Sequence, residues 1–132
     1  MMSDIIADGL TRIRNAATRK LETTTLLYSN SVVGILDVLK ADDYIDSYKI
    51  KEEKNNKKFI SVVLKYDDNE KSAINELKRE SKPGRRVYKS ASDVKNFKNG
   101  YGTMIISTNK GIIGNKEAFT QNVGGEVICS VW

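Results

Sequence analysis

The sequence predicts an α+β protein made of two small lobes. Two helical patterns occur early in the chain, whereas short strands and turns dominate its second half. No strand–helix–strand pattern recurs, which argues against a parallel α/β fold. The chain has 132 residues, of which 39% are hydrophobic, so it is long enough for one compact core but not for two large domains. We expect an N-terminal lobe over 1–66, with two helices on a sheet, and a C-terminal lobe over 67–132 that is mainly β with a short helix.

The first helix is predicted over residues 3–18. Ser3 suits its N-cap, and Asp4 suits the positive end of the helix dipole. At about 100° per residue, the apolar side chains fill one arc of this helix and the polar side chains fill the other. The polar arc contains Thr11, Arg12, Arg14 and Asn15. This arc is either a plain solvated face or a contact surface.

The rest of the N-terminal lobe is predicted from β propensity and apolar spacing. Residues 23–28 suit a strand, and residues 31–41 suit a helix that is apolar around most of its circumference. Residues 44–52 and 58–66 suit a hairpin that turns at Asn55-Asn56. Its apolar side is expected to face the second helix.

The C-terminal lobe is predicted as a series of short elements. A type II turn is expected at Lys82-Pro83-Gly84, because proline suits its second position and glycine its third. The last strand should place Cys129 on its buried side. The other elements are a strand over 103–108, a loop over 111–115, a short helix near 115–121 and a last strand over 126–132.

Several classes of site are excluded by composition. The chain has no histidine and one cysteine, which excludes histidine-dependent catalysis, an internal disulfide and a cysteine zinc cluster. The adjacent aspartate pairs, Asp42-Asp43 and Asp67-Asp68, are expected to be solvated rather than to hold a metal ion. We therefore expect no cofactor, no metal and no enzyme activity. No stretch approaches the roughly 18 apolar residues that a membrane span needs, and no signal peptide is apparent. A cytoplasmic location is therefore the default expectation.

Positive charge is concentrated in one segment, although the whole chain carries only +5. Between residues 82 and 116, Asp93 is the only acidic residue. The basic residues there are Lys82, Arg85, Arg86, Lys89, Lys95, Lys98, Lys110 and Lys116. Seven of the nine glycines also lie between Gly84 and Gly125. Such a segment suits phosphate contacts, since glycine allows close backbone approach and the cations neutralise charge. The alternative is a solvated surface rich in loops.

The run Ser107-Thr108-Asn109-Lys110-Gly111 follows a predicted strand and offers two hydroxyls, an amide and an ammonium. These groups can bond to base edges, sugar hydroxyls and phosphates without a deep pocket. A polar β-turn would look similar, so the run alone is a weak signal. It gains weight because it lies in the basic segment, in the same half of the chain as Arg85, Arg86 and Tyr88.

Four segments of the chain resemble the family of small-subunit ribosomal protein eight (the S-8 family) of bacteria, in order and over nearly the full length. They are residues 4–16 (DIIADGLTRIRNA), 81–88 (SKPGRRVY), 100–111 (GYGTMIISTNKG) and 123–132 (VGGEVICSVW). The resemblance implies two tightly packed α+β lobes that bind the central domain of small-subunit rRNA directly, at a distorted helix, during subunit assembly. It implies neighbouring small-subunit proteins as partners. It also implies, as an alternative function, repression of ribosomal-protein mRNA through the same surface.

The resemblance further implies which residues contact RNA. Ser107 and Thr108 match the hydroxyl positions of the family's RNA-reading loop, and Lys110 and Gly111 complete that loop. Asn109 departs from the serine that is usual there. Residues matched elsewhere are Tyr88 and Glu126, which touch or support the site, and Thr11, Arg14 and Asn15, which would contact the RNA backbone from the polar arc. Glu126 is expected to accept bonds from nearby groups and fix the loop, since a carboxylate repels phosphate.

A second departure concerns the start of the short helix, where Gly114 stands in place of the family's usual threonine. Without that hydroxyl a capping box with Glu117 loses its side-chain half. Nothing in the sequence indicates more than a monomer when the protein is free.

Overall fold

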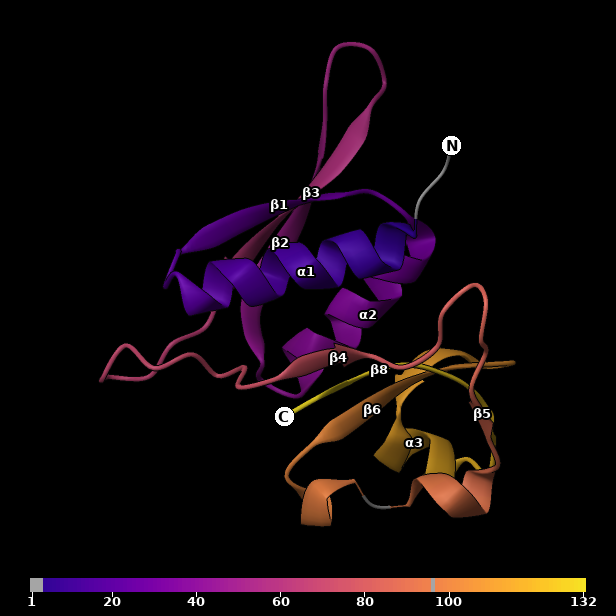
Figure 1. The fold of residues 1–132 in the computed structure, drawn as a ribbon. Coiled ribbons are helices and arrows are strands. Elements are labelled where there is room, and N and C mark those ends of the chain that lie inside the picture. Colours follow the sequence, from indigo (N-terminus) through magenta and orange to yellow (C-terminus); the bar gives the residue numbers. More distant parts are fainter. Residues whose placement is uncertain (1–3, 96) are drawn as a thin grey trace. The chain divides into compact units, whose positions relative to one another are not determined.

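The computed structural model describes residues 4–95 and 97–132, in which three α-helices accompany two antiparallel sheets (Figure 1). The chain forms two compact units, Met1–Ile74 and Asn75–Trp132. The predicted α+β class is confirmed, because the first unit combines two helices with a sheet and the second consists mainly of strands. None of the helices that the structure describes has the length and hydropathy of a membrane span. The assignment of RNA binding to residues 67–132 stays a prediction.

The first unit begins with helix α1, Ile5–Thr18. Asp4 is its N-cap, and its carboxylate accepts hydrogen bonds from the backbone amides of Ile6 and Ala7 at 3.1 and 3.2 Å. Ser3, which the sequence favoured as the cap, lies outside the described residues. The residues buried on α1 are Gly9, Leu10, Ile13, Ala16 and Ala17, all from the predicted apolar arc.

The sheet of this unit has the strand order β1-β3-β2. Its strands are β1, Thr23–Leu27; β2, Ile45–Glu52; and β3, Lys58–Leu64. Helix α2, Asn30–Ala41, packs against β2, and α1 packs against β1 (Figure 1). Alternate residues of β3 are buried, which confirms the predicted inward side of the hairpin.

The second unit is built around strand β8, Gly125–Val131. Strand β6, Thr103–Thr108, pairs along one edge of β8, while β4, Leu77–Arg79, and β5, Tyr88–Lys89, pair along the other. Strand β7 pairs with β6, and its bounds are Gly111–Gly114. Helix α3, Asn115–Thr120, and two short 3₁₀ helices, Ala91–Val94 and Lys98–Gly100, complete the unit.

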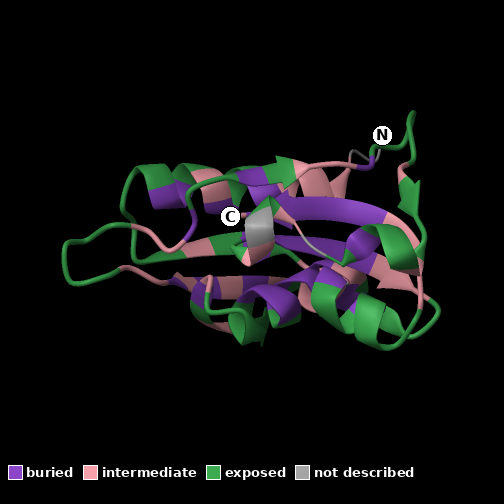
Figure 2. Cartoon of the chain, turned by 90° about the horizontal axis from the view of Figure 1, so that it is seen from below, coloured by how far each residue is buried: buried purple, intermediate pink, exposed green. Residues whose placement is uncertain are grey.

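The core of the second unit lies between α3 and the sheet. Its buried members are Val94, Met104, Ile106, Ile113, Ala118 and Val127. Asn115 is also buried, and its side chain accepts a hydrogen bond from the Met104 amide and donates one to the Val94 carbonyl, both at 3.0 Å. This amide therefore satisfies two backbone groups inside an apolar core. Figure 2 shows most loops of the chain as exposed and the strands as largely buried.

Two local predictions are wrong. Residues 111–114 form a strand rather than a loop, because pairing with β6 outweighs the low β propensity of the glycines at both ends. The turn at residues 82–85 is closed by two backbone hydrogen bonds of 2.9 Å between Lys82 and Arg85, but it is not type II. A type II turn needs positive φ at its third position, and Gly84 does not have it.

Gly114 is the N-cap of α3, as predicted, and makes no side-chain capping bond. Its φ of −77° and ψ of 161° are accessible to threonine. We expect Gly114→Thr to stabilise the protein by a few tenths of a kcal/mol, because the hydroxyl would accept a bond from the Glu117 amide. Thermal unfolding followed by circular dichroism should show a rise in Tm of roughly 1–2 °C. Gly114→Ala is the control, and a drop with threonine, or an equal rise with alanine, would contradict the capping argument.

Candidate nucleic-acid interface

Residues 107–111, which we call the 107–111 hairpin, form the tight turn between β6 and β7. Thr108 pairs with Gly111 across the turn, so Asn109 and Lys110 occupy its two exposed corners. Gly111 has a φ of +103°, a conformation that L side chains rarely adopt. The glycine therefore fixes the shape of the turn that presents Asn109 and Lys110 to solvent.

The two hydroxyls of the hairpin are in different situations. The Thr108 hydroxyl donates to the Gly111 carbonyl at 2.9 Å and accepts from the Lys110 amide at 3.0 Å, so it braces the turn. The Ser107 hydroxyl makes no hydrogen bond to any residue that the structure describes. Ser107 thus retains its full capacity to donate and accept, whereas Thr108 retains one acceptor lone pair.

A row of polar side chains crosses the sheet beside the hairpin. Ser107 on β6 lies directly opposite Glu126 on β8, and Glu126 lies directly opposite Tyr88 on β5. Directly opposed residues of antiparallel strands project from the same face, so these three side chains share one face of the sheet. Tyr88 is 68% exposed and offers its ring to solvent. Segments that are far apart in the sequence thus meet on one surface.

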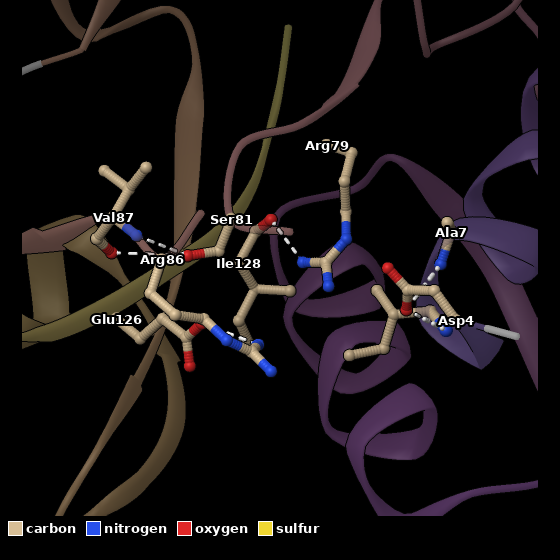
Figure 3. Close-up of polar contacts among 9 residues, drawn as sticks. Asp4, Ala7, Arg79, Ser81, Arg86, Val87, Glu126 and Ile128 are labelled. Carbon is tan, nitrogen blue, oxygen red and sulfur yellow. Dashed lines mark hydrogen bonds and ion pairs between the residues drawn. The ribbon is translucent and has the colours of Figure 1, made fainter. Parts of the chain in front are cut away.

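Arg86 joins this row through Glu126. Its guanidinium lies 3.1 Å from the Glu126 carboxylate (Figure 3). Both side chains are partly exposed, so the pair contributes at most about 1 kcal/mol to stability. Its main consequence is positional, because it holds one cation next to Tyr88 and Ser107. Glu126 therefore faces an arginine. This geometry is compatible with a role for Glu126 in supporting the site, and that role stays a prediction.

The basic loop before β5 is fixed from inside by Ser81. This serine is fully buried, and its hydroxyl accepts from the Val87 amide at 2.7 Å and donates to the Val87 carbonyl at 3.5 Å (Figure 3). Both ends of the loop that contains Arg85 and Arg86 are thereby joined. Ser81 belongs to a segment that carried the family resemblance, but its polarity alone gave no sign of this role.

The two residues that precede Glu126 must be glycines because other backbone segments lie too close to them to leave room for a side chain. A Cβ on Gly125 would lie 2.0 Å from the Ser107 carbonyl oxygen, and one on Gly124 would lie 2.4 Å from the Lys89 carbonyl oxygen. Neither contact is tolerated by real side chains. The glycines therefore let β8 pass closely between the backbone of Ser107 and that of Lys89.

The structure brings together most of the predicted site residues. The 107–111 hairpin and the adjoining row of the sheet contain Ser107, Thr108, Asn109, Lys110, Gly111, Arg86, Tyr88 and Glu126. Arg85 lies one residue before Arg86, in the exposed turn. Thr11, Arg14 and Asn15 belong to α1 in the first unit. Thr11 and Asn15 are exposed there, whereas Arg14 is half-buried.

A shallow hollow of about 190 Å³ lies beside α1 in the first unit. Its lining includes Asn15, Arg12, Arg19, Leu21 and Thr24. Arg12 is held there by Asp8 at 3.0 Å and by the Thr25 carbonyl at 3.2 Å. Arg12 and Arg19 thus supply positive charge on the same side of α1 as Asn15. Arg12 belongs to the predicted polar arc, whereas the sequence did not single out Arg19.

The described residues offer little for catalysis. Residues 4–95 and 97–132 contain no group of three or more acidic or cysteine side chains that could hold a metal ion. Cys129 is buried as predicted, and its burial raises the pKa of the thiol to about 12, so the reactive thiolate is absent at neutral pH.

Comparisons with known proteins agree with the resemblance seen in the sequence. The family model described as ribosomal protein S8 matches residues 4–132. The small ribosomal subunit protein uS8 of Aliarcobacter butzleri is 69% identical over 132 residues, which cover 100% of both chains. Proteins with the same name from Nautilia profundicola and Campylobacter fetus subsp. fetus are 61% and 60% identical, again over 100% of both chains. The chain therefore belongs to the ribosomal protein S8 family.

Proposed function

We propose that this protein binds directly to the central domain of small-subunit rRNA and helps to assemble the small ribosomal subunit in the cytoplasm. Its relatives are named as small ribosomal subunit proteins, which are structural components rather than enzymes. The observation that carries the proposal is the polar row of Ser107, Glu126 and Tyr88, flanked by Arg86 and by the 107–111 hairpin. Neighbouring small-subunit proteins complete the set of partners, and the free protein is a monomer.

In the proposed mechanism, basic side chains supply affinity, and the hairpin and the tyrosine ring supply selectivity for a distorted helix. Arg85, Arg86 and Lys110 neutralise phosphates and so position the protein, which adds affinity without sequence information. The Ser107 hydroxyl and the Tyr88 ring contact sugar and base groups that a distorted helix exposes and a regular duplex hides. Thr108 acts mainly through the shape of the turn. Thr11, Arg14 and Asn15 would add backbone contacts from α1.

Binding to a stem with an irregular centre, compared with a regular duplex of equal length, tests this proposal. We expect the irregular stem to bind more tightly at every salt concentration, with the same dependence on salt. Each neutralised phosphate should steepen the fall of log K with log salt by roughly 0.9. Ser107→Ala/Thr108→Ala should lose most of the preference and keep the slope.

Two single variants separate the roles of the hydroxyls. Ser107→Ala should reduce the preference directly, whereas Thr108→Ser keeps the bracing bonds and should leave the preference nearly unchanged. If both RNAs bind alike and no variant matters, the basic segment is only a non-specific polyanion surface and the proposal fails.

The same surface would accept an mRNA stem that reproduces the irregular site, which is the repressor alternative. Recognition through local shape does not distinguish the two RNAs. A competition experiment between the rRNA stem and the protein's own operon mRNA tests whether the two RNAs bind the same surface. Mutual displacement that depends on Ser107 supports repression, and failure of the mRNA to compete excludes it.

A further inference from the structure

A second surface of the C-terminal unit combines exposed aromatic rings with fixed cations. Tyr101 is 86% exposed and Phe119 is 40% exposed. Three exposed lysines accompany them, one directly after the first 3₁₀ helix, one in the second 3₁₀ helix and one in α3. We call this group the Tyr101 surface, and its members are Lys95, Lys98, Tyr101, Lys116 and Phe119.

Contacts within the unit show that these residues lie together. The Lys116 ammonium donates to the Gly100 carbonyl at 3.2 Å, which brings the start of α3 next to Tyr101. The Lys95 ammonium lies 5.5 Å from the centre of the Phe119 ring. The Lys98 ammonium lies 4.4 Å from the centre of the Trp132 ring. Each ammonium is therefore held by at least one neighbour, which reduces the conformational entropy lost when a ligand binds.

Little negative charge opposes these lysines. Asp93 accepts a hydrogen bond from the Ser90 hydroxyl at 3.0 Å, and Glu117 accepts one from Gln121 at 2.9 Å. Neither carboxylate forms an ion pair with any of the three lysines among the described residues. The surface is cationic and suits an anionic ligand.

The Tyr101 surface is separate from the 107–111 hairpin. Tyr101 lies just before the first residue of β6, and the hairpin begins at the last residues of the same strand. A strand of six residues spans roughly 17 Å, so the two surfaces lie at opposite ends of β6. One short ligand group cannot occupy both.

We propose that the Tyr101 surface binds a short single-stranded RNA segment. A base stacks on the exposed ring of Tyr101, while the adjacent phosphates contact Lys95, Lys98 and Lys116. Proteins that bind single strands combine cations that follow the backbone with aromatic rings on which bases stack. The carboxylates of an acidic peptide would use the lysines but cannot stack on the exposed ring of Tyr101 as a base can, which is why the geometry favours RNA.

Trp132 provides a local readout, because it is the only tryptophan in the chain. A phosphate that binds the Lys98 ammonium beside the indole ring should change the fluorescence of Trp132. The probe is a single-stranded adenylate hexamer added to the full-length protein. We expect a saturable change in Trp132 fluorescence, together with a loss of affinity of roughly five-fold or more in Tyr101→Ala. Tyr101→Phe keeps the ring and should bind nearly as well as the wild type.

Charge variants and competing polyanions complete the test. Lys98→Gln should make the fall of log K with log salt less steep by roughly 0.7, the value for one phosphate of a single strand. Ser107→Ala/Thr108→Ala should lose its preference for the irregular stem yet bind the hexamer as the wild type does, so the two proposals fail separately. Equal affinity for inorganic polyphosphate or a decaglutamate peptide, or an unchanged affinity in Tyr101→Ala, would overturn the assignment to RNA.

Discussion

Replacing Gly125 with alanine is expected to destabilise the C-terminal unit by at least about 3 kcal/mol. The new Cβ would lie 2.0 Å from the Ser107 carbonyl oxygen and 2.9 Å from the Ser107 carbonyl carbon. Overpacking a core usually costs about 1–3 kcal/mol because side chains can shift. Here the obstacle is the backbone of Ser107, which is the last β6 residue paired with β8 and is also paired with Ile112 on β7. Relieving the collision requires the start of β8 to move away from β6.

Equilibrium unfolding in urea measures this effect. We expect the midpoint of Gly125→Ala to fall well below that of the wild type, since a loss of this size is a large part of a typical stability of about 5–15 kcal/mol. Gly84→Ala is the matched control. A Cβ there meets nothing within 4 Å, and Gly84 does not need positive φ. Its stability should stay within about 0.5 kcal/mol of the wild type. Equal midpoints for the two variants would contradict the close approach.

The same substitution bears on recognition. Gly125 precedes Glu126, which joins the β6 and β5 parts of the polar row. Separating β8 from β6 would move Ser107 away from Glu126 and Tyr88. Under conditions where the variant remains folded, we expect it to lose the preference for the irregular stem while retaining its salt-dependent attraction to any RNA, because the cations remain.

Secondary structure was predictable where the signal is local. The apolar arc of α1 and the alternation along β3 follow from spacing alone, and both are confirmed. On β8 the burial of Cys129 is confirmed, but Ile128 and Ser130 on the other side are buried too, because both faces of the strand are covered. The strand at residues 111–114 was not predictable, since its two glycines disfavour a strand and only pairing with β6 stabilises it. The turn at Lys82–Arg85 was predicted in the right place but with the wrong type, because proline at the second position suits both types I and II.

The candidate interface was predictable in its members but not in its arrangement. Charge and hydroxyl content indicated residues 85–88 and 107–111, and the family resemblance added Glu126. Only the register of β5, β8 and β6 places these segments in one row. The different states of the Ser107 and Thr108 hydroxyls depend on backbone groups whose positions no sequence pattern specifies. The same holds for Asn115, whose amide serves two backbone groups of the core.

Ser81→Ala is expected to cost about 1–3 kcal/mol, although it removes a single oxygen atom. The Val87 amide would lose its 2.7 Å hydrogen bond to the buried hydroxyl. An unsatisfied donor in a buried position costs its full desolvation penalty. Water can replace the hydroxyl only if the loop opens, because Ser81 is fully buried. The loop that contains Arg85 and Arg86 should therefore become looser at its C-terminal end.

Two measurements distinguish this loosening from a general loss of stability. The urea midpoint should fall for Ser81→Ala and stay constant for Ser92→Ala, a matched control at an exposed serine. Amide hydrogen exchange should accelerate at Val87 more than at core amides such as that of Met104, which stays bonded to Asn115. Affinity for the irregular stem should fall as well, since Arg86 adjoins Val87 and would no longer be held beside Glu126. Unchanged exchange at Val87 would show that the hydroxyl does not fix the loop, and the basic side chains would then owe their placement to the Arg86–Glu126 pair alone.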